Sequence, residues 1–158
     1  LAYYATYFTL RCDGYDIKTM MKGMEASFKK RNEILTRVQN HEPVSNPELA
    51  TINALESTVE MYDRGYSFAP LNVMTSQATQ FSIDEKKNQV IPALTSINGL
   101  GESVALQIIK ARNEHPFTSV NDLMERAHVG QTMIEKLRSV NALDGLPDDD
   151  QMTLFDML

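Results

Sequence analysis

The feature that most limits how this chain can fold is a pair of glycines, one residue apart, just before a helix-forming stretch. The run reads Ile97-Asn98-Gly99-Leu100-Gly101 and continues into Glu102-Ser103-Val104-Ala105. Glycine adopts backbone angles that are closed to other residues, and it has no Cβ to obstruct a ligand. The apolar residue between the glycines is expected to turn inward, and the apolar spacing that follows predicts an amphipathic helix. Residues 97–112 therefore predict a hairpin that leads directly into a helix.

Such a hairpin is chemically suited to bind an anion. Its N–H groups and those of the first helical turn point outward together, and the helix dipole makes them electropositive. We expect them to bind a phosphate of duplex DNA, which is a contact without base information. Glu102 conflicts with this prediction unless its side chain points away from the phosphate. The predicted contact residues are Asn98, Gly99, Leu100, Gly101, Ser103 and Lys110, the last reaching a neighbouring phosphate.

Residues 119–140 repeat the order of helix, short turn and helix, with one glycine in place of two. Ser119 with Asp122, and Thr132 with Glu135, have the spacing of residues that begin helices. A second phosphate contact is predicted at Gly130, Gln131 and Thr132. Two alternatives stay open: the first hairpin could be a purely structural turn, and the second copy could only pack against the first.

The remainder of the chain is predicted to be helical apart from one short β-hairpin. Apolar spacing indicates helices over residues 2–10 and 16–40, and a further helix with Asn46 as its N-cap that stops at Gly65. Residues 81–83 and 90–94 flank a polar stretch and predict two paired strands, with Pro92 restricting its strand to an edge or a bulge. The predicted fold class is mainly α with a small β-hairpin region, ending in a tandem helix–hairpin–helix domain.

The net charge of −6 argues against nucleic-acid binding, because phosphate binders are usually basic. The charge is unevenly distributed, however: residues 1–40 hold seven Lys and Arg against four Asp and Glu, whereas residues 148–158 hold four acids and no base. The basic residues 22 and 29–31 form either a solvated face or a patch that follows phosphates. The acidic balance keeps open a helical protein-interaction domain of a replication or repair assembly that does not bind DNA.

Other sequence features bear on location and cofactors. Cys12 is the only cysteine, which is typical of cytoplasmic proteins, and no apolar run approaches the roughly 18 residues of a membrane span. The first residues lack the pattern of a signal peptide and resemble the interior of a helix, so we expect a fragment of a longer chain. Neither His115 and His128 nor any carboxylates suggest a metal site. We therefore expect no catalytic residue and no cofactor in the fragment.

The tail combines an acidic spacer, Asp148 to Asp150, with the run Gln151-Met152-Thr153-Leu154-Phe155. In an extended peptide of this kind, Leu154 and Phe155 can enter a pocket of a partner while hydrogen bonds hold Gln151. The alternative is a free end, or a tail folded onto its own domain.

Taken in order, four segments resemble the C-terminal end of the PolC-type alpha subunit of bacterial DNA polymerase III: residues 1–9, 64–68, 97–101 and 116–123. The resemblance implies that residues 1–65 are the end of the fingers region and residues 66–147 the duplex-binding region. It implies that residues 148–158 are an acidic spacer and a tail that binds the sliding clamp. The clamp-binding residues would be Gln151, Met152, Leu154 and Phe155.

The parent that the chain resembles is a DNA-directed DNA polymerase, a nucleotidyltransferase that also carries an exonuclease. Its catalytic aspartates and their magnesium lie upstream, so the resemblance implies that this fragment is inactive alone. The expected function is to hold duplex DNA and link it to the clamp during DNA replication, in the bacterial cytoplasm at the nucleoid. The expected partners are duplex DNA, the sliding clamp, the rest of the alpha subunit and the replisome. A monovalent cation held by hairpin carbonyls and an independent nuclease or polymerase remain alternatives.

Overall fold

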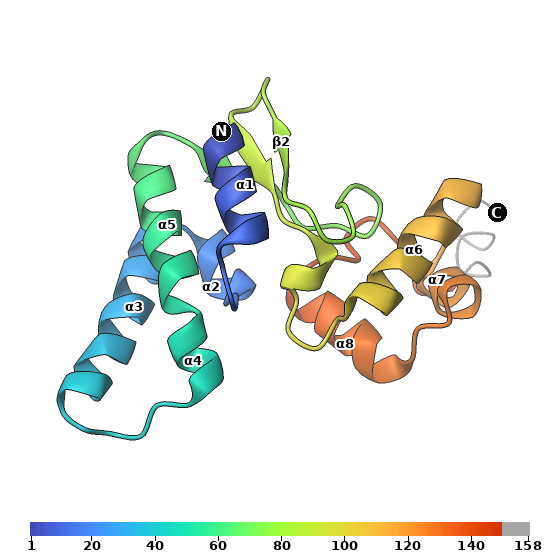
Figure 1. Ribbon diagram of the computed structural model, residues 1–158. Helices are drawn as coiled ribbons and strands as arrows, with labels where there is room; N and C mark the ends of the chain where they lie inside the picture. The colour runs from blue at the N-terminus through green and yellow to red at the C-terminus, as the bar shows by residue number, and fades with distance from the viewer. Residues whose placement is uncertain (150–158) are drawn as a thin grey trace. The chain divides into compact units, whose positions relative to one another are not determined.

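The computed structural model describes residues 1–149, which form two compact units (Figure 1). The first unit contains residues 1–70 and 80–92, and the second contains residues 71–79 and the described residues from 93 onward. Helices predominate, and the only sheet of the described residues has three short strands, which confirms the predicted fold class. No helix among residues 1–149 is both long and apolar enough to cross a bilayer.

The helices of the first unit are more divided than predicted. They are α1 (Ala2–Leu10), α2 (Ile17–Lys22), α3 (Met24–Gln39), α4 (Asn46–Ala50) and α5 (Ile52–Asp63), with α3 and α5 side by side (Figure 1). The single helix predicted over residues 16–40 is wrong, because Gly23 has φ +118 and separates α2 from α3. The N-cap of α4 is Ser45 and not Asn46, and Ser45 forms a capping box with Glu48.

The core of the first unit is aromatic. Tyr4 and Phe8 on α1 are buried, whereas Tyr3 is 64% exposed, so the predicted aromatic face of α1 is only partly covered. The ring centroid of Phe8 lies 5.2 Å from that of Phe68 and 5.3 Å from that of Phe81. The aromatic residues of α1 therefore hold the helix against the sheet.

The sheet contains the predicted β-hairpin and one strand that the sequence did not predict. Its strands are β1 (Ser67–Phe68), β2 (Ser82–Asp84) and β3 (Gln89–Ile91), in the order β1-β3-β2. Val90 of β3 lies opposite Phe68 in parallel pairing and opposite Ile83 in antiparallel pairing. The strand beside Pro92 is therefore central, and the predicted edge position is wrong. Proline is accommodated because β3 ends at Ile91, before a backbone N–H of residue 92 is needed.

The second unit contains η1 (Leu94–Ser96), a single 3₁₀ turn, followed by α6 (Glu102–Glu114), α7 (Val120–Ala127) and α8 (Gln131–Ser139). Helix α7 packs against both α6 and α8. Buried apolar side chains from all these elements form the core: Leu94, Ile97, Leu100, Ala105, Ile108, Leu123, Ile134 and Leu137.

The segment 71–79 joins the second unit although it precedes the β-hairpin in sequence. The N–H of Val73 donates to the carbonyl of Ala142 at 3.0 Å. The Arg112 guanidinium donates to the carbonyls of Val73 and Ser76, at 3.0 and 2.8 Å. Burial lowers the pKa of Arg112. Arg112 thus holds this segment against α6 and is committed to internal contacts.

Candidate nucleic-acid interface

The first hairpin is a tight turn with an exposed tip. The N–H of Leu100 donates to the carbonyl of Ile97 at 3.1 Å, and Gly99 has φ +85, as the third residue of a type II turn requires. Ile97 and Leu100 are buried, whereas Asn98 and Gly99 are exposed. The side chain of Leu100 points inward as predicted, so any contact that Leu100 makes with a ligand uses its main chain.

Helix α6 begins directly after this turn. Its N-cap is Gly101, whose carbonyl accepts the N–H of Ala105 at 3.0 Å, and no side chain of the described residues caps the helix. The first N–H groups of an α-helix have no acceptor within the helix. Gly101, Glu102 and Ser103 are all exposed. The donors of this helix end are therefore available to an anion from outside.

The two glycines of the first hairpin are needed for different reasons. Gly99 has a positive φ, and a Cβ at this position would overlap the ammonium of Lys136. Gly101 has an ordinary φ of −80, and a Cβ at this position would meet nothing within 4 Å. Backbone strain thus explains Gly99 but not Gly101, since the lysine at Gly99 is flexible and can move aside. A glycine at position 101 is useful if a ligand outside the protein approaches the backbone closely.

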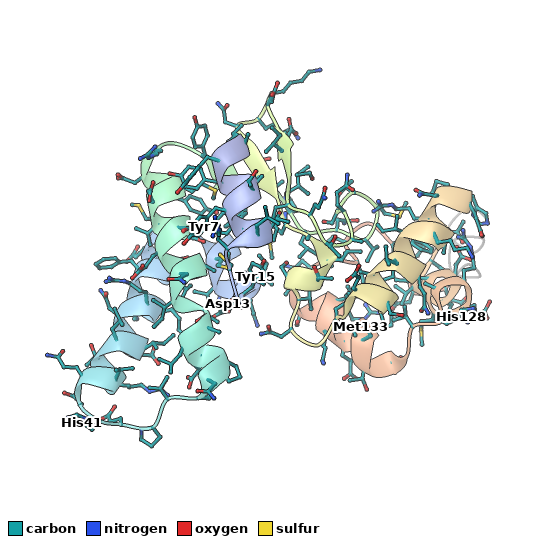
Figure 2. The ribbon with its side chains drawn as sticks, viewed as in Figure 1. Tyr7, Asp13, Tyr15, His41, His128 and Met133 are labelled. Atoms are coloured by element: carbon teal, nitrogen blue, oxygen red, sulfur yellow. The ribbon has the colours of Figure 1, made fainter. Side chains whose placement is uncertain are left out.

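The second hairpin repeats this geometry. Gly130, the N-cap of α8, has φ −83 and ψ 171, against −80 and 169 for Gly101, and its carbonyl accepts the N–H of Ile134 at 3.1 Å. A Cβ at Gly130 would also meet nothing within 4 Å. His128 takes the place of Gly99, with φ +56, and lies at the turn before α8, which carries Met133 (Figure 2). Val129 is buried, as Leu100 is in the first hairpin.

The helix starts in this unit match the sequence prediction only in part. Ser119 is the N-cap of α7 and accepts the N–H of Asp122 at 2.9 Å. The start predicted at Thr132 is wrong: α8 begins at Gln131, with Gly130 as its N-cap and no capping side chain among the described residues. The backbone of Gly130 already has the N-cap conformation, so Thr132 falls within the first turn. Gln131 and Thr132 are both exposed there.

The outer face of α6 carries mixed charge. Glu102, Ser103, Leu106, Gln107 and Lys110 line one shallow hollow, and the side chain of Leu106 is 51% exposed. Glu102 therefore lies on the same face of α6 as Ser103 and Lys110, where the sequence predicts phosphate contacts. Lys110 lies about 12 Å along the helix axis from Glu102. It suits a neighbouring phosphate better than one at the hairpin itself.

Sequence reasoning missed Lys136. It lies on α8, outside the local pattern of the first hairpin, yet its side chain reaches Gly99. Only the packing of the second motif against the first brings the two residues together. The sequence of residues 97–112 gives no indication of this contact.

A monovalent cation at the first hairpin would bind its main-chain carbonyls. The carbonyl of Ile97 accepts the turn hydrogen bond, and that of Gly101 accepts the first bond of α6. Each of these oxygens keeps a second lone pair, so the two hydrogen bonds do not exclude an ion, and a monovalent cation at the hairpin stays a prediction.

Arg126 holds the two motifs together. Its Nη1 donates to Asp122 Oδ2 at 2.8 Å, and its Nη2 donates to the carbonyls of Ala111 and His115, at 2.6 and 2.9 Å. Its guanidinium also lies 5.1 Å from the ring centroid of Phe117. Arg126 thus links the C-terminal end of α6, in the first motif, to α7, in the second.

The basic residues of α3 are partly neutralised. Arg31 Nε lies 3.0 Å from Glu56 Oε1, and Lys30 Nζ lies 3.8 Å from Glu33 Oε1. This pairing favours a solvated face over a phosphate-binding patch. The predicted clamp-binding residues Gln151, Met152, Leu154 and Phe155 lie outside the described residues.

Comparisons with known proteins agree with this geometry. The family model of the helix–hairpin–helix motif matches residues 65–152. DNA polymerase III PolC-type of Streptococcus pneumoniae serotype 2 (strain D39) is 40% identical over 156 residues, and that of Bacillus subtilis (strain 168) is 42% identical over 155 residues. The same protein of Ureaplasma parvum is 37% identical over 158 residues.

These matches cover 98–99% of this chain but only 10–11% of each relative, so the chain spans about a tenth of the length of the relatives. They confirm the resemblance to PolC-type DNA polymerase III. The family model covers more than half of the chain, over the part that contains both hairpins. The chain therefore belongs to the helix–hairpin–helix family and is similar over nearly its whole length to a segment of PolC-type DNA polymerase III.

Proposed function

We propose that this chain binds the backbone of duplex DNA without sequence specificity, as a non-catalytic part of a bacterial replicative polymerase of the PolC type. In this proposal, residues 1–65 are the end of the fingers region, residues 66–147 bind the duplex, and the protein acts in the cytoplasm. One observation carries the proposal. Gly101 and Gly130 begin two helices in the same backbone conformation, and each leaves its helix end uncapped and sterically open.

Two such helix ends within one unit suit two phosphates of a duplex. Each has unpaired main-chain N–H groups at the positive end of a helix dipole. The similarity to PolC-type DNA polymerase III supports DNA as the source of these phosphates. Contacts to phosphates set the position and orientation of a protein on the duplex and leave the base edges unread.

The binding of the 158-residue chain to duplex DNA should weaken steeply with salt and should not depend on base sequence. Fluorescence anisotropy with two labelled duplexes of equal length and unrelated sequence measures both properties. Because each neutralised phosphate contributes a slope of about −0.9, we expect a plot of log affinity against log salt to fall with a slope of about −1 to −3. Equal affinities for the two duplexes would support backbone binding.

Absence of binding, or binding that salt does not change, would contradict the proposal and favour a protein-interaction domain. The net charge of −6 and the exposed Leu106 on α6 are the observations that favour this second function. A domain of that kind would use the same outer face of α6 for a protein partner.

We also propose that residues 151–155 bind a sliding clamp. The support is the sequence: a glutamine, two intervening residues and the apolar pair Leu154-Phe155 follow an acidic spacer. Replacing both Leu154 and Phe155 by alanine should weaken binding to the clamp of the same bacterium by about 100-fold, because buried anchors dominate such peptide contacts. Surface plasmon resonance measures the loss. Leu158→Ala is the matched control, and equal weakening by that change would contradict the assignment.

A further inference from the structure

We infer that Lys136, on the last helix of the second motif, contacts the phosphate bound at the first hairpin. The inference rests on the proposed function and adds a residue to it. Neither the hairpin sequence nor the family match assigns a role to this lysine. The second motif would then contribute a side chain to the phosphate site of the first, in addition to binding a phosphate at the start of α8.

The position of the side chain carries the inference. A Cβ built on Gly99 would overlap Lys136 Nζ and would lie 3.4 Å from its Cε and 3.7 Å from its Cδ. The end of the lysine therefore runs along the face of Gly99 that lacks a side chain. Gly99 thus serves two purposes, because it permits the positive φ of the turn and leaves room for the ammonium.

The ammonium of Lys136 is positioned but not neutralised. Over residues 1–149, the ion pairs of the structure involve Lys30, Arg31, Arg37, Arg64, Arg126 and Arg138, and none involves Lys136. No side-chain hydrogen bond in that part of the chain uses its Nζ either, although the residue is half-buried. The ammonium is therefore held beside Gly99 with no acidic side chain of the described residues paired to it. A phosphate at the first hairpin would supply an anion for it.

The positive charge of Lys136 also lies at the part of the first hairpin that has no other cation nearby on its own motif. Glu102 lies in the first turn of α6 and repels a phosphate, while Lys110 lies about 12 Å along the helix from it. Lys136 brings a positive charge to the exposed tip at Gly99, next to the uncapped helix end. Lys136 is the sixth residue after the N-cap glycine of α8. The sixth residue after the N-cap glycine of α6 is Gln107, which is neutral. The first hairpin therefore receives its nearest cation from the other motif.

The test compares Lys136→Gln, Lys136→Arg and the wild-type chain for binding to a labelled duplex across a salt series. Lys136→Gln should weaken binding about five- to tenfold at 0.1 M salt and reduce the magnitude of the salt slope by about one, because one phosphate contact is lost. Lys136→Arg should keep both the affinity and the slope. Lys18→Gln, which removes an exposed lysine from α2, outside residues 66–147, is the matched control and should change neither.

The outcomes separate the inference from the proposed function. If the wild-type chain does not bind the duplex, the proposed function fails and the inference fails with it. If the wild-type chain binds with the expected salt slope but Lys136→Gln has the same affinity and slope, only the role of Lys136 is overturned.

A second measurement covers the case in which Lys136→Gln does not fold. The wild-type chain is treated with an amine-acetylating reagent with and without saturating duplex, and the modified lysines are identified by mass spectrometry. Duplex should protect Lys136 at least several-fold and leave the modification of Lys18 unchanged. Equal modification of Lys136 in the presence and absence of duplex would overturn the inference without any substitution.

Discussion

Replacing Gly101 and Gly130 together by valine is expected to lower the affinity for duplex DNA by about 100-fold or more. Each substitution places a branched side chain over an uncapped helix end, where the phosphate must approach the N–H groups. A hydrogen bond to a charged group is worth about 1.5–3 kcal/mol, and about 1.4 kcal/mol corresponds to a tenfold change in affinity. Each single variant should therefore weaken binding by at least about tenfold.

The fold should survive both substitutions. Gly101 and Gly130 have φ of −80 and −83, which valine adopts readily, and a Cβ at either position meets nothing within 4 Å. Loss of a glycine N-cap costs up to about 1 kcal/mol per helix. Gly99 is the wrong choice for this test, because its φ of +85 would strain any side chain and confuse binding with stability.

Fluorescence anisotropy at 0.1 M salt measures the affinities, and circular dichroism with urea verifies the fold. Asn53→Val, on an exposed position of α5, is the matched control for adding a surface valine and should leave binding unchanged. Retention of wild-type affinity by the folded double variant would mean that the helix ends at the two hairpins do not hold the DNA.

The largest expected loss of stability comes from Arg126→Met. Methionine keeps the apolar stem but removes the bonds to Asp122 and to the carbonyls of Ala111 and His115. The side chains of Arg126 and Asp122 are only 18% and 15% exposed, so solvent replaces these bonds poorly. We expect the free energy of unfolding to fall by about 2–4 kcal/mol. Urea denaturation followed by circular dichroism measures the change.

Arg64→Met is the matched control, because Arg64 also pairs with an acid four residues away. Its pair with Glu60 is exposed, at 64% and 50%, and such pairs contribute about 0–1 kcal/mol. A loss of similar size in both variants would show that Arg126 acts as an ordinary surface arginine.

The effect of Arg126→Met should also depend on pH. Burial opposes ionisation of Asp122, but the N–H of Thr118 and the Arg126 guanidinium outweigh it, so the pKa of Asp122 lies below its usual 3.8. The corresponding stability is present above pH 3.8 and disappears as the pH falls through the lower pKa of the folded state. The difference between wild type and Arg126→Met should therefore narrow below pH 3.8.

Residues close together in sequence determined the first hairpin, the approximate helix pattern and the pairing of β2 with β3. The positive φ at Gly99, the buried Leu100 and the N-cap at Ser119 each depend on neighbours within one or two turns of chain. Such local preferences are readable because glycine, a capping side chain or apolar spacing selects a conformation without help from distant residues. The break between α2 and α3 at Gly23 is also local. It was not predicted because the apolar spacing continues across the glycine and indicates one unbroken helix.

Only the tertiary structure decided which distant residues meet. The parallel pairing of Phe68 with Val90, the association of residues 71–79 with the second unit, and the contact of Lys136 with Gly99 join positions 22 or more residues apart. The bonds of Arg126 to the end of α6 span 15 and 11 positions and also depend on how the helices pack. Such contacts follow from how the amphipathic helices bury their apolar faces against one another, and many packings satisfy the same one-dimensional pattern. The local sequence thus defines each hairpin, whereas the charges and links around it come from packing.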